Sequence, residues 1–297
     1  MTHTIKIPEK VDFLESMSSS YNYDPDYIKK DKYWIRARED YEKYFINGDH
    51  KTSRYRIPPK IHQIWMGSEL PAKYAKWTES WKKYHPDWEY YLWTDEEISK
   101  LKFQNRDVFY GTKNFGPKSD ILRYELLNQF GGLYIDTDFE CFQPFDFLHV
   151  NMDFYAGIEF GRELTTTTSI IASVPGHPIV KYLLNAIDKP VTTDDTDIIH
   201  EITGPWAFSN AYRAYMFDDN YRQVLMPVSY FFPFPNNKIH IQNEKNILKF
   251  RKKESMALHY WEVSWLGKKS FVGRMISKIL RSVPPGIKGK IKSILGK

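Results

Sequence analysis

The sequence has little of several features that define particular classes of protein. It contains one cysteine, Cys141, in 297 residues, which excludes an internal disulfide and is typical of a reducing compartment. No run approaches 18 consecutive apolar residues, so we expect no single helix that spans a membrane. The first residues carry charges throughout, without an apolar core, so we expect no secretory signal. These absences predict a folded protein of the cytoplasm.

Acidic residues are absent from the carboxyl end. The whole chain has 42 basic and 37 acidic residues, a net charge of +5. Nine of the basic residues follow Gly267, and the rest of the chain therefore has 33 basic against 37 acidic residues, a net charge of −4. A body of this sign is a poor nucleic-acid binder, so we expect no nucleic-acid partner. The basic tail needs its own explanation.

Aromatic residues are unusually frequent. They make up 16% of the chain, with 9 Trp, 21 Tyr and 19 Phe, while the hydrophobic fraction of 42% and the charged fraction of 27% are ordinary for a globular protein. Aromatic faces suit flat, ring-shaped partners such as sugars and bases, and a tyrosine-rich core is the alternative.

The pattern of residues predicts three segments. Residues 1–56 are predicted to form a helical extension, residues 57–267 a catalytic domain, and residues 268–297 a basic tail. The domain begins with a short apolar strand at residues 60–65, a helix from about Pro71 to Tyr84, and an aromatic strand, WEYYLWT. This order predicts a βαβ unit and an α/β fold with a parallel sheet.

The most informative stretch is residues 118–138, KSDILRYELLNQFGGLYIDTD. Ser119 is predicted to cap a helix, and Gly131 and Gly132 to end it, because glycine adopts the left-handed conformation without steric cost. The next residues, LYID, are predicted to form a strand. Asp136 and Asp138 are thereby delivered to the carboxyl end of that strand.

Later segments are shorter and more mixed. The four threonines at residues 165–168 are predicted to form a loop. Pro178 and the Gly204-Pro205 pair are each predicted to open a helix.

Asp136 and Asp138 are candidate metal ligands. Two carboxylates one residue apart can converge on one divalent cation where the backbone bends, and oxygen ligands select Mg²⁺ or Mn²⁺. A solvated turn is the alternative for an isolated D-x-D. Asp120 and Arg123 lie three residues apart on one helix face, where they could bind sugar hydroxyls and phosphate oxygens. An intrahelical ion pair is the alternative there.

These residues resemble a known family. KIHQIW at residues 60–65, the tryptophan-rich run at 81–93, the block at 118–138 and H-x-x-x-x-S-W at 259–265 are similar to the DXD-containing glycosyltransferases of family 32. The resemblance covers roughly residues 57–265. It implies a GT-A fold, a Mn²⁺ or Mg²⁺ ion held against the diphosphate of a nucleotide-sugar donor, and retention of anomeric configuration.

The resemblance also implies roles for individual residues. Asp136, Asp138 and His259 would hold the metal, with Asp136 acting directly, through water or on the ribose. Asp120 and Arg123 would bind the hydroxyls of the donor sugar, and together with Asp136 and Asp138 they are the predicted catalytic residues. Trp65, with Ile64 beside it, would line the pocket of the base. The remaining predicted contacts with the nucleotide-sugar are Lys118, Ser119, Tyr134, Ser264 and Trp265. The alternative for Lys118 is an exposed lysine, and for His259 a surface or core residue.

The chemistry of sugar transfer agrees with these roles. Breaking the glycosidic bond adds negative charge to the diphosphate, which a cation stabilises, and the sugar becomes oxocarbenium-like. The sequence identifies no carboxylate nucleophile, so we expect front-face attack.

The tail places apolar residues at helical spacing among basic ones, which predicts a helix lying on an anionic membrane. The alternatives are packing on the body or a disordered end. The resemblance and the tail together imply a transferase at the inner face of the cell membrane that uses a UDP-sugar and a lipid-linked saccharide acceptor in capsular or exopolysaccharide synthesis. The alternatives are a toxin-like transferase that modifies protein, a carbohydrate-binding protein without catalysis, and a metal-dependent phosphoesterase.

Overall fold

The computed structural model describes residues 5–48, 54–159, 163–241 and 243–262. Contacts along the chain divide it into two units, Met1–Trp261 and Glu262–Lys297, and the elements described below belong to the first. The predicted tail at 268–297 and the predicted site residues Ser264 and Trp265 lie outside the described residues. Among the described residues, no helix is both long enough and apolar enough to cross a membrane.

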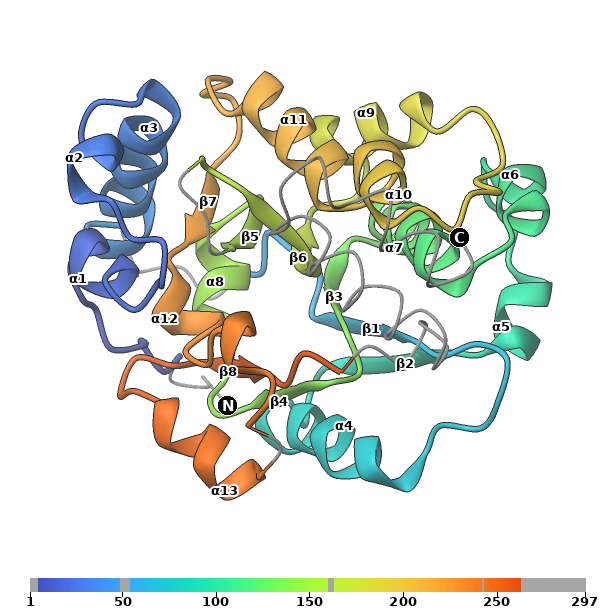
Figure 1. Ribbon diagram of the computed structural model, residues 1–297, viewed down its shortest axis with the longest axis horizontal. Helices are drawn as coiled ribbons and strands as arrows, with labels where there is room; N and C mark the ends of the chain where they lie inside the picture. Colours follow the sequence, from blue (N-terminus) through green and yellow to red (C-terminus); the bar gives the residue numbers. More distant parts are fainter. Residues whose placement is uncertain (1–4, 49–53, 160–162, 242, 263–297) are drawn as a thin grey trace, which may run out of the picture. The chain divides into compact units, whose positions relative to one another are not determined.

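A six-stranded mixed sheet forms the centre of the first unit (Figure 1). Its strand order is β2-β1-β3-β6-β5-β7, and β6 runs antiparallel to its neighbours while the other pairs are parallel. The strands are β1 (Lys60–Ile64), β2 (Glu89–Trp93), β3 (Gly132–Ile135), β5 (Phe154–Ile158), β6 (Thr166–Ser173) and β7 (Gln223–Met226). The predicted βαβ unit is present as β1, α4 (Ala72–Tyr84) and β2, and the predicted α/β class is confirmed.

Helices connect most of the strands and surround them. In the order of the chain they are α5 (Asp95–Lys100), α6 (Arg106–Gly111), α7 (Phe115–Phe130), α8 (Asp146–Asn151), α9 (Pro178–Ala186), α10 (Thr196–Ile202), α11 (Pro205–Tyr215), α12 (Val228–Phe231), η2 (Asn236–Lys238), α13 (Glu244–Ile247) and η3 (Leu248–Phe250). Helix α7 packs on β1, β3 and β6, α11 packs on β6, and α9 contacts both helices, so the three share one face of the sheet. The predicted helix starts at Pro178 and Pro205 are confirmed.

The N-terminal segment packs against the β7 edge of the sheet. It contains α1 (Phe13–Met17), α2 (Pro25–Ile28), α3 (Lys32–Asp40) and the π-helix η1 (Tyr41–Ile46), and α3 and η1 contact β7 (Figure 1). Tyr41 and Phe45 are fully buried, and both rings contact Tyr230. The residues predicted as a helical extension therefore share the hydrophobic core of the sheet domain.

Helix α7 begins earlier than its sequence suggests. Asn114 is the residue before its first turn, and Ser119 lies inside the helix, so the prediction that Ser119 caps it is wrong. The helix ends as predicted, because Gly131 and Gly132 have φ angles of 61° and 99°. A Cβ atom on Gly132 would lie 2.7 Å from the carbonyl oxygen of Lys60, so only glycine lets β3 start this close to β1.

The threonine run is also different from its prediction. Thr166, Thr167 and Thr168 are buried residues of β6, not part of a loop. Threonine is β-branched and favours strands, and here the run forms the start of β6, where Thr166 pairs with Ile158 of β5. Its composition was polar enough to suggest a turn, but its strand-forming shape and its burial outweighed that polarity.

A second, two-stranded sheet brings the end of the domain back to the centre. Strand β4 (Phe139–Cys141) pairs antiparallel with β8 (Ala257–His259), with Phe139 opposite His259. This pairing places His259 beside the turn that joins β3 to β4.

Candidate active site

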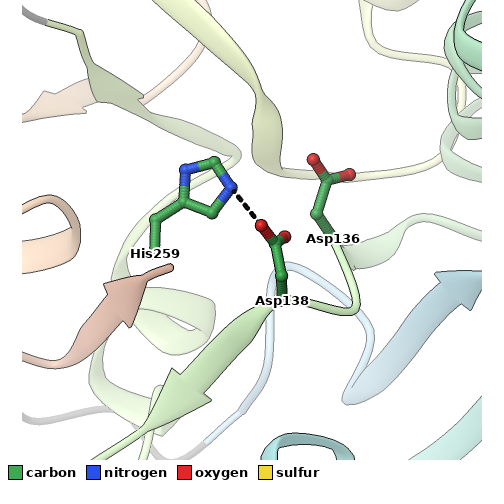
Figure 2. A group of neighbouring side chains, drawn as sticks. All are labelled: Asp136, Asp138 and His259. Carbon is green, nitrogen blue, oxygen red and sulfur yellow. Dashed lines mark ion pairs between the residues drawn. The ribbon is translucent and has the colours of Figure 1, made fainter. Parts of the chain in front are cut away.

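Two carboxylates and one imidazole converge at the turn between β3 and β4. Asp136 follows β3, Asp138 precedes β4, and His259 ends β8. One possible ligand atom from each of the three lies within 4.8 Å of the other two. Figure 2 shows the three side chains facing one another, with Nε2 of His259 3.1 Å from a carboxylate oxygen of Asp138. The three residues predicted as metal ligands are thus brought together from separate elements.

Backbone hydrogen bonds fix the position of this turn. The amide of Asp136 donates to the carbonyl of Ser169 in β6, at 2.9 Å. The carbonyl of Asp138 accepts from the amide of Tyr260, at 3.0 Å, and that of Asp136 accepts from the Gln63 side chain, at 3.2 Å. Bonds to both sheets therefore hold the two carboxylates.

His259 is held by aromatic rings. It stacks on Phe139, with 4.4 Å between ring centroids, and also contacts Phe232 and Trp261. Trp261 has a φ of 58°, an uncommon conformation for a large side chain, and its indole donates to the carbonyl of Phe234. Nδ1 of His259 is buried, and no described residue forms a hydrogen bond with it. The ring is thus fixed by packing, with Nε2 directed at Asp138.

A second group of charged side chains lies on α7. Arg123 lies 3.3 Å from one carboxylate oxygen of Asp120, and Thr203 donates to the other, at 2.9 Å. The predicted ion pair is therefore present, but it is buried, with Asp120 6% and Arg123 5% exposed. Burial raises the pKa of Asp120 to about 6, although the Arg123 charge opposes that shift.

Arg123 and Tyr134 join the two groups. The guanidinium of Arg123 lies 3.6 Å from Asp136 and over the ring of Tyr134, 4.4 Å from its centroid. The Tyr134 hydroxyl donates to Asp136 at 2.6 Å. Burial raises the pKa of Asp136, which Arg123 opposes and the nearby Asp138 charge reinforces. Asp120, Arg123, Tyr134, Asp136, Asp138 and His259 thus form one connected polar site.

The other predicted residues lie around this site. Ile64 ends β1 and Trp65 follows it, at the same sheet edge as Asp136, since β1 and β3 are parallel. The Trp65 indole donates to Ser68 and Glu69. The Lys118 ammonium lies over the ring of Phe109, and the carbonyl of Ser119 accepts from Arg123.

Sequence reasoning missed two residues that support the site. Gln63 binds the carbonyl of Asp136, and Thr203 binds the carboxylate of Asp120. Thr203 directly precedes the Gly-Pro pair that opens α11. The sequence therefore predicted a helix start next to Thr203, but it did not predict the hydrogen bond with Asp120.

Comparison with known proteins identifies the class. Residues 71–155 match the model of the glycosyltransferase sugar-binding region containing a DXD motif. That range contains both the Asp120–Arg123 pair and the Asp136–Asp138 motif. The chain carries this sugar-binding region, and the predicted resemblance to the DXD-containing glycosyltransferases of family 32 is confirmed.

Two yeast proteins are similar over part of their length. Inositol phosphoceramide mannosyltransferase 1 of Schizosaccharomyces pombe is 29% identical over 141 residues, which are 45% of this chain and 44% of that protein. Mannosyl phosphorylinositol ceramide synthase SUR1 of Saccharomyces cerevisiae is 30% identical over 146 residues, 48% of this chain and 37% of that protein. The chain therefore spans less than half the length of these relatives. Among solved structures, the catalytic domain of alpha-toxin from Clostridium novyi aligns with a TM-score of 0.46 at 11% identity, covering 77% of this chain and 83% of that one.

Proposed function

We propose that the protein is a metal-dependent, retaining glycosyltransferase that moves a sugar from a nucleotide-sugar to a lipid-linked saccharide. The observation that carries this proposal is the convergence of Asp136, Asp138 and His259 at the carboxyl edge of the sheet, next to the buried Asp120–Arg123 pair. The matched DXD region supports it independently of that geometry.

The donor atoms fit a divalent cation such as Mn²⁺ or Mg²⁺. Asp136 and Asp138 offer carboxylate oxygens, which suit hard cations, and His259 offers an imidazole nitrogen held in place by stacked rings. These three residues would hold the ion. When bound, it would stabilise the negative charge that develops on the leaving diphosphate.

Arg123 and Asp120 are the two residues of α7 that we expect to bind the donor. Arg123 is fixed by the carbonyls of Ser119 and Thr168, so its guanidinium stays beside Asp136 without reorganisation. A fixed cation there favours a negatively charged diphosphate. Asp120, anchored by Thr203, is the residue we expect to accept hydrogen bonds from the hydroxyls of the donor sugar.

The identities of the donor and of the acceptor are also part of this proposal. The relatives are named for adding mannose to a phosphoinositol ceramide, which supports a lipid acceptor and makes mannose a sugar to include among donors. We propose a UDP-sugar as the donor and surface polysaccharide synthesis, at the inner face of the cell membrane, as the process.

Thermal stabilisation by nucleotides tests the site. The unfolding temperature of the protein is measured with UDP, GDP and their sugar conjugates, with and without Mn²⁺, and so is that of Asp138→Asn. We expect one nucleotide series to raise it only when Mn²⁺ is present, and the variant to lose that rise, because one of the two carboxylate ligands is gone.

A matched control is Asp107→Asn, which changes an exposed carboxylate on α6 and should keep the full response. If no nucleotide stabilised the unmodified protein under any condition, the transferase proposal would be wrong, and the carbohydrate-binding alternative would take its place.

A further inference from the structure

Glu159 lies at the same sheet edge as the site but belongs to a different strand. It directly follows β5, and its amide donates to the carbonyl of Thr165 at 2.8 Å. Strands β3 and β5 both run antiparallel to β6, so the carboxyl end of β5 lies at the edge where β3 delivers Asp136. Only β6 separates them in the sheet.

The ring of Phe232 lies between this end of β5 and His259. A Cβ atom on Gly157 would lie 2.4 Å from the ring of Phe232, so the glycine lets that ring lie directly against the strand. The same ring contacts His259, with 5.8 Å between centroids. Two residues beyond Gly157, the carboxylate of Glu159 interacts electrostatically with His259.

The surroundings of Glu159 leave its carboxylate available. The residue is partly open to solvent, and no described residue forms a hydrogen bond or ion pair with its side chain. Tyr21, which is 44% exposed, interacts electrostatically with it. A partly exposed carboxylate of this kind suits a sugar, whose hydroxyls are hydrogen-bond donors.

The order of strands separates the two ends of the site. Trp65, the predicted base contact, follows β1, and the candidate metal ligand Asp136 follows β3. Glu159 follows β5, on the side of β3 away from β1. A donor that runs from its base at β1 to its diphosphate at β3 therefore presents its sugar, and the acceptor beyond that sugar, toward β5.

We propose that Glu159 contacts the acceptor, accepting a hydrogen bond from the hydroxyl that attacks the donor sugar and so orienting it. This inference rests on the proposed function, since it assumes that a nucleotide-sugar binds at Asp136 and Asp138. It adds to the site a residue with a role that the sequence motifs did not assign.

The test uses the full chain with Mn²⁺ and the nucleotide-sugar that stabilises it, and measures release of the nucleoside diphosphate with water as the acceptor. We expect Glu159→Gln to lower kcat at least tenfold, because the attacking hydroxyl loses its charged partner. The KM for the donor and the stabilisation by nucleotide should stay unchanged. Glu39→Gln, at an exposed glutamate of α3, is the matched control and should change neither quantity.

Two results for Glu159→Gln would overturn this inference. An unchanged kcat would show that Glu159 does not orient the attacking group. A loss of nucleotide-dependent stabilisation would show that it belongs to the donor or metal site instead. Failure of the proposed function is distinguishable from both, since it would abolish stabilisation and release in the unmodified protein.

Discussion

Asp120 shows how a single buried carboxylate couples this site to stability. Burial raises the pKa of Asp120 to about 6, because removing the charged carboxylate from water costs more free energy than its contacts with Arg123 and Thr203 supply. A carboxyl group with a raised pKa keeps its proton in the folded protein at a pH where the unfolded chain has lost it. Its contribution to stability is therefore full below about pH 4 and is lost as the pH rises to about 6.

Asp120→Asn should remove this pH dependence. The free energy of unfolding is measured by denaturant titration at pH 4 and pH 7 for both proteins, and the difference between them is compared. From pH 4 to pH 7 the unmodified protein should lose up to about 3 kcal/mol relative to the variant, since the shift is roughly two pKa units. Other groups with raised pKa values, such as Asp40, are present in both proteins and cancel. A difference that stays constant with pH would contradict the raised pKa.

Residues of the site were predictable from sequence when they lay in one contiguous motif. Asp120, Arg123, Asp136 and Asp138 lie within 19 residues. The spacing of apolar residues in this stretch predicts the helix and the strand that carry them. Thr203, by contrast, binds Asp120 from 83 positions away. Such a partner depends on how α10 and α11 pack, and no local pattern specifies that. Glu159 was missed for the same reason, because its role follows from strand order.

At the scale of elements, the glycine pair between α7 and β3 sets the position of the motif. Gly132→Ala should destabilise the protein by roughly 1–3 kcal/mol, because alanine at a φ of 99° is strained and its Cβ would meet the carbonyl oxygen of Lys60. We also expect weaker Mn²⁺-dependent stabilisation by nucleotide, since β3 carries Asp136. Denaturant titration and the nucleotide assay measure the two effects.

Gly116→Ala is the control for this element. Gly116 lies in the first turn of α7, with a φ outside the left-handed region, so alanine there should be neutral or slightly stabilising. Equal effects of the two substitutions would mean that the conformation of Gly132 is not what positions the strand.

Element boundaries were less predictable than element types. The end of α7 is encoded by two adjacent glycines, whose left-handed φ angles few other residues adopt. Its start has no comparable signal, because Asn114 and Ser119 are both suitable capping residues and packing of the first turn decides between them. Thr166–Thr168 similarly have a polar composition and a strand-forming shape, and pairing with β5 and burial decide the outcome.

At the scale of the whole molecule, charge is divided between two parts of the sequence. Residues up to Gly267 carry a net charge of −4, and the nine basic residues that follow supply the excess. An acidic body is repelled by an anionic membrane, so any attraction to such a surface must come from the tail. Each basic residue near an anionic bilayer contributes about 1 kcal/mol of binding free energy, and the apolar residues spaced among them add the burial of their side chains.

Deleting residues 268–297 should therefore abolish sedimentation of the protein with vesicles that contain anionic lipid. Changing Arg274, Lys278 and Arg281 together to Gln keeps the apolar residues and should weaken that binding by roughly a hundredfold. Vesicles of zwitterionic lipid alone serve as the control and should bind all forms weakly. The deleted form should still respond to nucleotide and Mn²⁺, because Asp136, Asp138 and His259 all precede the deletion. Unchanged sedimentation of the deleted form would place the membrane contact on the acidic body, and the tail would then need a different role.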